Sequence, residues 1–172
     1  RTASASPGPS GNAYAVRSRE AALKSLVIGG TGPTGHHIVN GLRERGHAVT
    51  ILHRGHHEIP EIPEDVVHLH GDPYDPKSLR ETLGNRDFDC CVATYGRLRE
   101  VAEVMAKRCG RFVSVGGVPA YRGFMNPGLF RPAGLQVPIR EDAERVRDES
   151  EDDKGYRIVR TEERVFEHIP GA

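Results

Sequence analysis

The feature that most constrains this chain is a glycine-rich turn between an apolar run and an amphipathic segment, within residues 26–39. Its glycines follow the pattern Gly-x-x-Gly-x-x-Gly, which differs from the Gly-x-Gly-x-x-Gly of many dinucleotide-binding proteins. Without Cβ atoms the chain turns tightly, approaches a pyrophosphate closely and seats the next helix on its strand. A tight turn without a ligand is the alternative. The residues expected to hold phosphate are Gly29, Gly32, Pro33, Thr34 and Gly35, although Pro33 has no N–H to donate.

Length and composition suit one domain with a real core. The 172 residues include 24 basic and 24 acidic side chains, a balance that argues against a dominant nucleic-acid or membrane patch. No apolar run approaches the roughly 20 residues of a membrane span, and no signal-peptide pattern is visible. The three cysteines read as buried free thiols in a reducing compartment, so we expect a cytoplasmic or organelle-stroma protein. Because the chain starts at Arg1 and stops just after a helix-like segment, we expect an incomplete protein.

Strand and helix patterns alternate along most of the chain. Residues 1–23, whose first twenty are rich in Ser, Ala, Gly and Pro, are expected to be a disordered tail or upstream sequence. Residues 24–172 then form the folded domain, with a long loop at 118–140 and an acidic helix or loop at 141–153. The alternation predicts a doubly wound α/β fold, in which helices cover both faces of a parallel sheet. We expect strands at 25–29, 47–52, 65–70, 88–93 and 111–115, and helices at 34–45, 76–83, 97–109 and 154–168.

Arg54 follows the second predicted strand, about 20 residues beyond the glycine turn. An acidic residue at this place would hydrogen-bond an adenosine ribose 2′-hydroxyl, and it would repel a 2′-phosphate. A guanidinium instead binds a phosphate through two parallel hydrogen bonds. The sequence therefore favours NADP over NAD, with a solvated turn arginine as the alternative.

Two further positions suit a nucleotide site. Asp72 follows the third predicted strand, where its carboxylate would accept a hydrogen bond from the adenine amino group or form a local Asx turn. Ala93 and Gly96 come at the end of the fourth strand, and their small size allows a ligand to approach closely. In such sheets the ligand binds where the strand order reverses, over the carboxyl ends of strands one and four.

These motifs resemble the short-chain dehydrogenase/reductase superfamily, in its extended or atypical branch of NAD-dependent epimerase/dehydratase proteins. The resemblance covers residues 24–172 and rests on the glycine turn, on Arg54-Gly55, on Gly71-Asp72 and on residues 112–117. It implies a Rossmann domain that binds NAD(P), truncated before a C-terminal substrate domain. It also implies a nucleotide-sugar-like or other hydroxyl or carbonyl substrate, transient hydride transfer, and a possible homodimer of the full-length protein.

The resemblance also implies a catalytic Ser or Thr after the fifth strand and a Tyr-x-x-x-Lys motif on a helix. Tyr156 and Arg160 have this spacing, with arginine in place of lysine; Tyr156 would act as acid/base assisted by the Arg160 charge. If Tyr121 matches the family's tyrosine near the fifth strand, the Ser/Thr position falls on Gly117, which has no hydroxyl.

A second register remains open, because the family often has a glutamate four residues after its lysine. Matching that residue to Glu162 puts Ile158 at the lysine position and leaves no catalytic tyrosine. The full-length protein is then either an NADP-preferring epimerase, dehydratase or oxidoreductase, or a non-catalytic dinucleotide-binding regulator or RNA-binding protein of the same fold. The fragment itself is expected to be inactive.

Histidines cluster in the sequence at 53, 56, 57, 68 and 70. They invite a metal interpretation, but no Cys/His pairing with the spacing of a structural zinc site accompanies them. His68 and His70 share one face of a predicted strand. We therefore assign no metal ligand from the sequence.

Overall fold

The computed structural model describes residues 21–94 and 96–172, so most of the predicted N-terminal tail lies outside the described residues. Its centre is a five-stranded parallel sheet in the order β3-β2-β1-β4-β5. The strands are β1 (Lys24–Ile28), β2 (Ala48–His53), β3 (Val67–His70), β4 (Phe88–Ala93) and β5 (Cys109–Ser114). The helices are α1 (Gly35–Glu44), α2 (Pro76–Leu83), α3 (Leu98–Met105) and α4 (Glu149–His168), with 3₁₀ turns η1 (Val118–Ala120) and η2 (Pro127–Leu129). This order confirms the predicted doubly wound fold.

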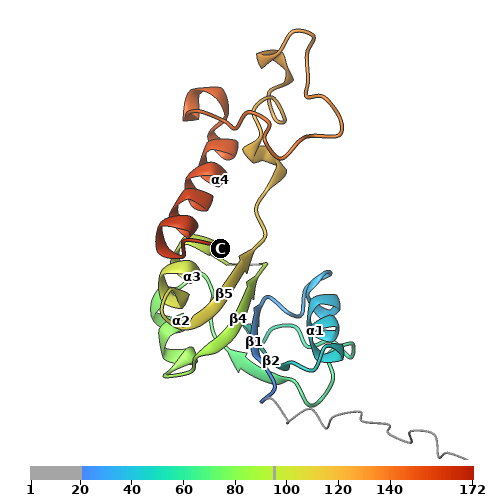
Figure 1. Ribbon diagram of the computed structural model, residues 1–172, viewed down its shortest axis with the longest axis vertical. Coiled ribbons are helices and arrows are strands. Elements are labelled where there is room, and N and C mark those ends of the chain that lie inside the picture. Colours follow the sequence, from blue (N-terminus) through green and yellow to red (C-terminus); the bar gives the residue numbers. More distant parts are fainter. Residues whose placement is uncertain (1–20, 95) are drawn as a thin grey trace, which may run out of the picture.

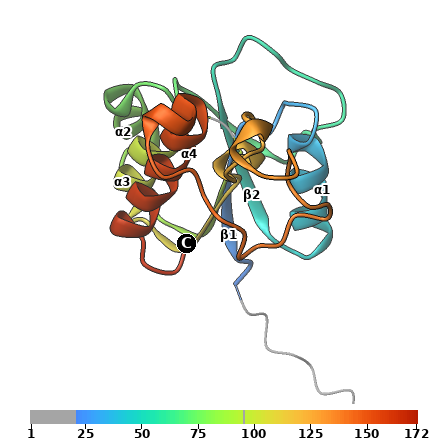
Figure 2. The same cartoon turned by 90° about the horizontal axis from the view of Figure 1, so that it is seen from above.

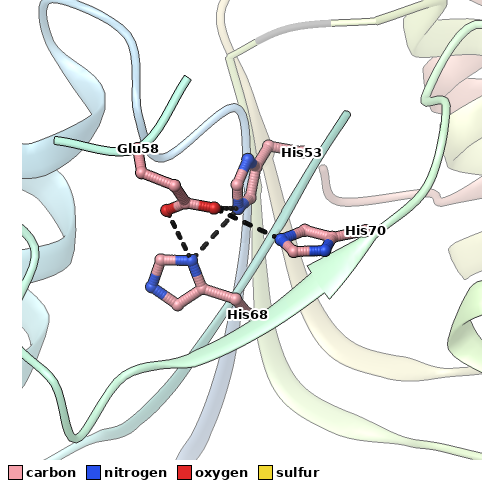
Figure 3. Close-up of side chains that lie close together, drawn as sticks. All are labelled: His53, Glu58, His68 and His70. Carbon is pink, nitrogen blue, oxygen red and sulfur yellow. Dashed lines mark hydrogen bonds and ion pairs between the residues drawn. The ribbon is translucent and has the colours of Figure 1, made fainter. Parts of the chain in front are cut away.

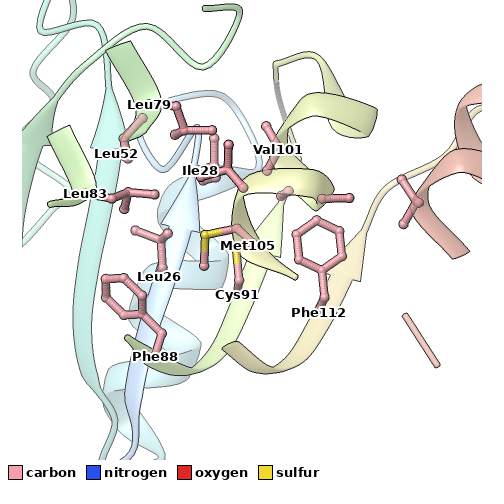
Figure 4. Close-up of a cluster of buried hydrophobic side chains, with 14 residues drawn as sticks. Leu26, Ile28, Leu52, Leu79, Leu83, Phe88, Cys91, Val101, Met105 and Phe112 are labelled. Atoms are coloured by element: carbon pink, nitrogen blue, oxygen red, sulfur yellow. The ribbon is translucent and has the colours of Figure 1, made fainter. Parts of the chain in front are cut away.

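The helices lie in two layers on either side of the sheet (Figures 1 and 2). Alternate strand residues point to opposite faces, so Leu26 and Ile28 pack toward α2 and α3, while Val27 packs toward α1. Figure 4 shows the larger of these two clusters, which includes the fully buried Met105 and Phe112. α4 packs alongside α3 in the same layer. Right-handed crossovers explain this division. Because the chain moves across the sheet in the opposite direction after β3, α1 lies on one face and α2 and α3 lie on the other.

The two faces of the sheet are covered by helices to different extents. Val113 in β5 points away from the α3 side, where its neighbour Phe112 is buried, and it is 44% exposed. In the described part of the chain, α1 is the helix on that face, and it packs against β1 and β2. Helices thus lie on both faces of the sheet, as predicted, and on the α1 face they leave β5 exposed.

One connection differs from the predicted helices and strands, and a second, as predicted, contains no helix. Helix α3 ends at Met105 rather than at Cys109, because Cys109 and Gly110 already belong to β5 and Cys109 pairs with Phe88 of β4. The crossover from β2 to β3, residues 54–66, is irregular and carries turns instead of a helix. This loop is therefore free to place several polar side chains over the carboxyl ends of β2 and β3.

Helix α4 begins earlier than predicted, within the acidic segment. Asp148 is its N-cap, and its carboxylate accepts hydrogen bonds from the backbone N–H groups of Ser150 and Glu151. The backbone is non-helical at Asp152, which separates the first turn from the rest.

Residues 115–148 form a lobe beyond the sheet, beside the start of α4 (Figure 1). Arg122 ties this lobe to α4 through an ion pair of 2.8 Å with Glu151. Among the described residues, no helix is both long and apolar enough to cross a membrane.

Candidate functional site

The glycine turn connects β1 to α1 through residues that tolerate no side chain at two places. Gly29 has a φ of 93°, which L side chains rarely adopt, and its N–H donates to the Leu52 carbonyl of β2 at 3.0 Å. A Cβ on Gly35 would lie 2.5 Å from the carbonyl oxygens of both Gly29 and Gly30. By contrast, a Cβ on Gly32 would meet the Gly29 carbonyl at an ordinary 3.6 Å. Gly29 and Gly35 therefore build the turn, whereas Gly32 faces open space.

Helix α1 starts from this turn with its N-terminus directed at that space. Thr34 is the N-cap residue and makes no side-chain capping hydrogen bond, and no acidic residue stands in the first turn. The positive end of the helix dipole is therefore not neutralised by a neighbouring carboxylate. A helix start of this kind favours an anionic ligand.

A hollow of about 280 Å³ lies against the turn and the end of β2. The lining residues on the turn include Gly32 and Thr34, and those after β2 include Arg54. Arg54 is exposed, so its guanidinium lies at the edge of the hollow rather than in the core. The full lining is Gly29, Thr31, Gly32, Pro33, Thr34, His53, Arg54, His56, His57 and Thr94. The structure thus brings the predicted phosphate turn and the predicted 2′-phosphate residue to one cavity.

The other two predicted nucleotide residues lie elsewhere. Ala93 is fully buried in the core cluster, and the next residue, Thr94, lines the hollow instead. Thr94 donates from its hydroxyl to the Ile28 carbonyl at 3.2 Å, so its side chain is anchored to β1. Asp72 forms the Asx turn, because its Oδ1 accepts the Tyr74 N–H at 2.9 Å. Sequence reasoning missed Thr94, which an i+1 shift at the end of β4 would have found.

Tyr156 and Arg160 lie together on α4, one turn apart, and line a different hollow between α3 and α4. Tyr156 is partly buried and also packs against a small apolar cluster of Ala120, Val146 and Val159. Arg160 is exposed and pairs with Glu163 one turn further along the helix. Their catalytic role stays a prediction.

Another face of α4 meets the end of β5. A Cβ on Gly117 would lie 2.9 Å from Cδ1 of Ile158, and a Cβ on Gly116 would lie 2.4 Å from Oε1 of Glu162. These are the two α4 residues of the alternative register. Glu162 is in turn paired with Arg145, which belongs to the lobe. A hydroxyl-bearing residue at position 117 would therefore require Ile158 to move.

Histidines from β2 and β3 gather beside the hollow, together with a glutamate from the intervening loop. Figure 3 shows His53, Glu58, His68 and His70 directed toward one another. Burial of His53, which is 5% exposed, lowers the pKa of its imidazole, and the nearby Glu58 carboxylate partly offsets this effect. His53, His68 and His70 belong to the five histidines that cluster in the sequence, to which no metal was assigned. Glu58 was not predicted to join them, because nothing in the sequence shows how an irregular loop folds back.

Comparisons with known proteins agree with this fold. The profile of a family described as NAD(P)H-binding matches residues 29–162. The chain is similar to the Bordetella bronchiseptica enzyme WbmG in complex with NAD, at 15% identity and a TM-score of 0.66, over 87% of this chain and 51% of that one. WbmG in complex with NAD and UDP aligns at 14% identity and a TM-score of 0.63, over 84% and 49%.

A third similar structure is UDP-N-acetylglucosamine 4-epimerase from Bacillus cereus, at 18% identity and a TM-score of 0.57, over 84% of this chain and 50% of that one. The chain therefore spans about half the length of these solved structures. Identities this low establish the shared fold alone. A search of curated proteins finds no match.

Proposed function

The chain belongs to the NAD(P)H-binding family, and we propose that it binds NADP(H), in preference to NAD(H), in the hollow between the glycine turn and the end of β2. One observation carries the proposal: the turn that suits a diphosphate and the arginine that suits a 2′-phosphate line the same cavity. The turn also leaves its backbone accessible to a diphosphate. The turn presents the Cβ-free side of Gly32 to the hollow, so a diphosphate can approach the backbone.

Each part of the coenzyme then meets a distinct part of the chain. The N-terminus of α1, led by Thr34, supplies dipole and backbone stabilisation to the diphosphate. Arg54 supplies positive charge and paired hydrogen bonds to the 2′-phosphate. His56 and His57 line the same edge and offer ring nitrogens for hydrogen bonds. Bound nicotinamide coenzyme supplies hydride-transfer chemistry.

In the full-length protein we propose that this domain serves an epimerase, dehydratase or oxidoreductase acting on a nucleotide-sugar-like substrate. The structures most relevant to this idea are those of WbmG with NAD and UDP and of the Bacillus cereus epimerase. Tyr156 would hold and transfer a proton at a substrate hydroxyl, assisted by the neighbouring Arg160. Arg160 already pairs with Glu163, which reduces the charge available to Tyr156.

A non-catalytic coenzyme-binding regulator is the second candidate, and one specific observation favours it. The space beside Gly117, where the family resemblance places a Ser or Thr, is occupied by the Ile158 side chain. An apolar residue at that place neither binds a reacting oxygen nor lowers the pKa of a tyrosine. A salt-dependent shift of RNA by the full-length protein would support this candidate over the enzyme.

Calorimetric titration of the chain with NADPH and with NADH tests the binding proposal. We expect NADPH to bind more tightly by about 10- to 100-fold, the range for a charge-assisted contact of roughly 1.5–3 kcal/mol. Arg54→Ala should remove this preference. Arg45→Ala is the matched control, because Arg45 carries the same charge at the far end of α1, where it bonds to the Gly41 carbonyl. Equal affinities in the wild type would refute the NADP preference, and no binding of either coenzyme would refute the site.

A further inference from the structure

Four metal-ligating side chains converge at the carboxyl ends of β2 and β3. His53 ends β2, His68 and His70 alternate along β3, and Glu58 reaches back from the crossover loop (Figure 3). His68 and His70 share a face because strand residues two apart point the same way. The register pairs His53 with His70, which brings the β2 histidine next to them. The ligand atoms of all four residues lie within 4.8 Å of one another.

The separations resemble those of a tetrahedral ligand set. Zn–N and Zn–O bonds of about 2.0–2.1 Å place tetrahedral ligand atoms about 3.3–3.4 Å apart. His53 Nε2 lies 3.2 Å from His68 Nδ1. The Glu58 carboxylate oxygens lie 3.6 Å from His53 Nε2, 3.0 Å from His68 Nδ1 and 3.3 Å from His70 Nε2. With Oε1 of Glu58 as its ligand atom, three of the six pairwise separations therefore fit before any atom moves; the 3.0 Å contact to His68 is made by the second oxygen, Oε2.

The donor types select the class of ion. Three imidazoles and one carboxylate suit Zn²⁺ and similar first-row divalent ions, whereas Mg²⁺ and Ca²⁺ prefer sets made of oxygen ligands. The cluster contains no thiolate that would favour a softer ion such as Cu(I). We propose that His53, Glu58, His68 and His70 bind one divalent transition-metal ion, for which Zn²⁺ is the best fit.

The same contacts say what must change when the ion binds. The Gly55 backbone N–H donates to Nδ1 of His53 at 3.2 Å, so a neutral His53 carries its proton on Nε2. Ligation through Nε2 requires the proton to leave that atom and Nδ1 to become the protonated nitrogen. The Gly55 N–H must then turn away, and Gly55, with a φ of 75°, is a residue whose backbone adapts readily. Metal binding is thus coupled to a local rearrangement next to Arg54.

An ion at this place would also order the crossover loop. Glu58 is half exposed and sits on a segment without helix or strand, while His53 is buried in β2. A bond from the ion to each would tie the loop to the sheet. Three of the four ligands lie outside the hollow and His53 lines both, so Zn²⁺ binding can be measured in the absence of coenzyme and does not require the coenzyme proposal to hold.

The test is calorimetric titration of the full 172-residue chain with ZnCl₂, with MgCl₂ as the control ion. We expect one Zn²⁺ per chain and no comparable Mg²⁺ binding. The variant His68→Gln/His70→Gln should weaken Zn²⁺ binding by roughly 100-fold or more, since loss of even an outer partner of a metal ligand weakens affinity by about 10- to 100-fold. Co²⁺ substituted for Zn²⁺ should give the visible absorption of a tetrahedral nitrogen and oxygen site.

The matched control is His56→Gln/His57→Gln, which removes two histidines from the same loop but none from the cluster. This variant should keep the wild-type affinity for Zn²⁺. Circular dichroism checks folding, and Glu58→Gln, a change at a half-exposed loop position, tests the site if the β3 variant does not fold. Equal loss of affinity in both histidine variants would overturn the proposal. Unchanged Zn²⁺ binding in both Glu58→Gln and His68→Gln/His70→Gln, measured separately, would also overturn it.

Discussion

Gly35 at the start of α1 packs directly against the carbonyl oxygen of Gly29, and a Cβ between them would lie 2.5 Å from that oxygen. The obstacle is backbone, which cannot rotate away as a side chain does. Gly35→Ala should therefore lower the free energy of unfolding by about 3 kcal/mol, near the upper end for overpacked sites. Urea denaturation followed by circular dichroism measures this change, and an unchanged midpoint would contradict the packing described for the turn.

Gly32→Ala is the matched change in the same turn. Its Cβ meets the Gly29 carbonyl at 3.6 Å, and the residue has no positive φ, so stability should change by less than about 1 kcal/mol. The same methyl group would project toward the hollow and hold a diphosphate away from the backbone. We expect calorimetry to show NADPH binding weakened by about tenfold or more. Unchanged NADPH affinity in Gly32→Ala would mean that the diphosphate does not approach this turn.

Arg54→Glu should invert the coenzyme preference rather than only remove it. A carboxylate at this place repels a 2′-phosphate and accepts a hydrogen bond from a ribose 2′-hydroxyl. NADPH affinity should fall by about 100-fold or more, and NADH affinity should stay within about threefold of the wild type. Parallel titrations give both values. A similar fall for both coenzymes would mean that Arg54 supports the loop and does not recognise the phosphate.

Strand and helix order was predictable because the apolar runs and their glycine stops are local signals. Helix α2 and strand β4 have the predicted bounds. For α2 the signals are local: Asp75 and Pro76 mark its start, and Gly84 follows its end. Cys109 was wrongly placed in a helix, and its pairing with Phe88 in the sheet decided the outcome. Propensity within one segment cannot anticipate a ladder to a distant strand.

The candidate site divides in the same way. Residues within one turn, such as Gly29 and Gly32, line one hollow, because a short loop fixes their positions relative to each other; their role in phosphate binding stays a prediction. Glu58 was missed, because its approach to His68 depends on how 13 loop residues, 54–66, fold over two strands. Which face of α4 meets the end of β5 depends on the path of the lobe; the sequence favoured the Tyr156/Arg160 register and left the Ile158/Glu162 register open.

Tyr156→Phe in the full-length protein tests the catalytic register. Loss of an acid/base hydroxyl should lower turnover by about 100-fold or more while NADPH affinity stays unchanged, because Tyr156 lies outside the coenzyme hollow. Tyr121→Phe is the control, because Tyr121 belongs to the lobe and lines a separate hollow. Turnover equal to wild type in Tyr156→Phe would remove this residue from the mechanism and favour the register with Ile158 and Glu162.

The buried cysteine thiols make the free energy of unfolding depend on pH in the alkaline range. Burial raises the pKa of the Cys109 thiol from 9.0 to about 11, and burial also raises the pKa of the fully buried Cys91. Between these values the unfolded chain loses a thiol proton that the folded chain keeps, so the free energy of unfolding falls as pH rises above about 9. Urea denaturation at pH 7, 9 and 10 measures the slope. Cys109→Ala should show a shallower slope than wild type, and an identical slope would contradict the raised pKa.

Zn²⁺ and NADPH should bind cooperatively, because Gly55, which must turn when His53 binds a metal ion, follows Arg54 directly in the chain. An ion that ties Glu58 to His53 orders the loop before the coenzyme arrives, which reduces the conformational entropy lost on coenzyme binding. We expect saturating Zn²⁺ to raise NADPH affinity by about fivefold, and NADPH to raise Zn²⁺ affinity by the same factor, as linkage requires. Calorimetry in both orders of addition measures both factors. His68→Gln/His70→Gln should abolish the effect, and a Zn²⁺ effect that persists in this variant would place the coupling ion elsewhere.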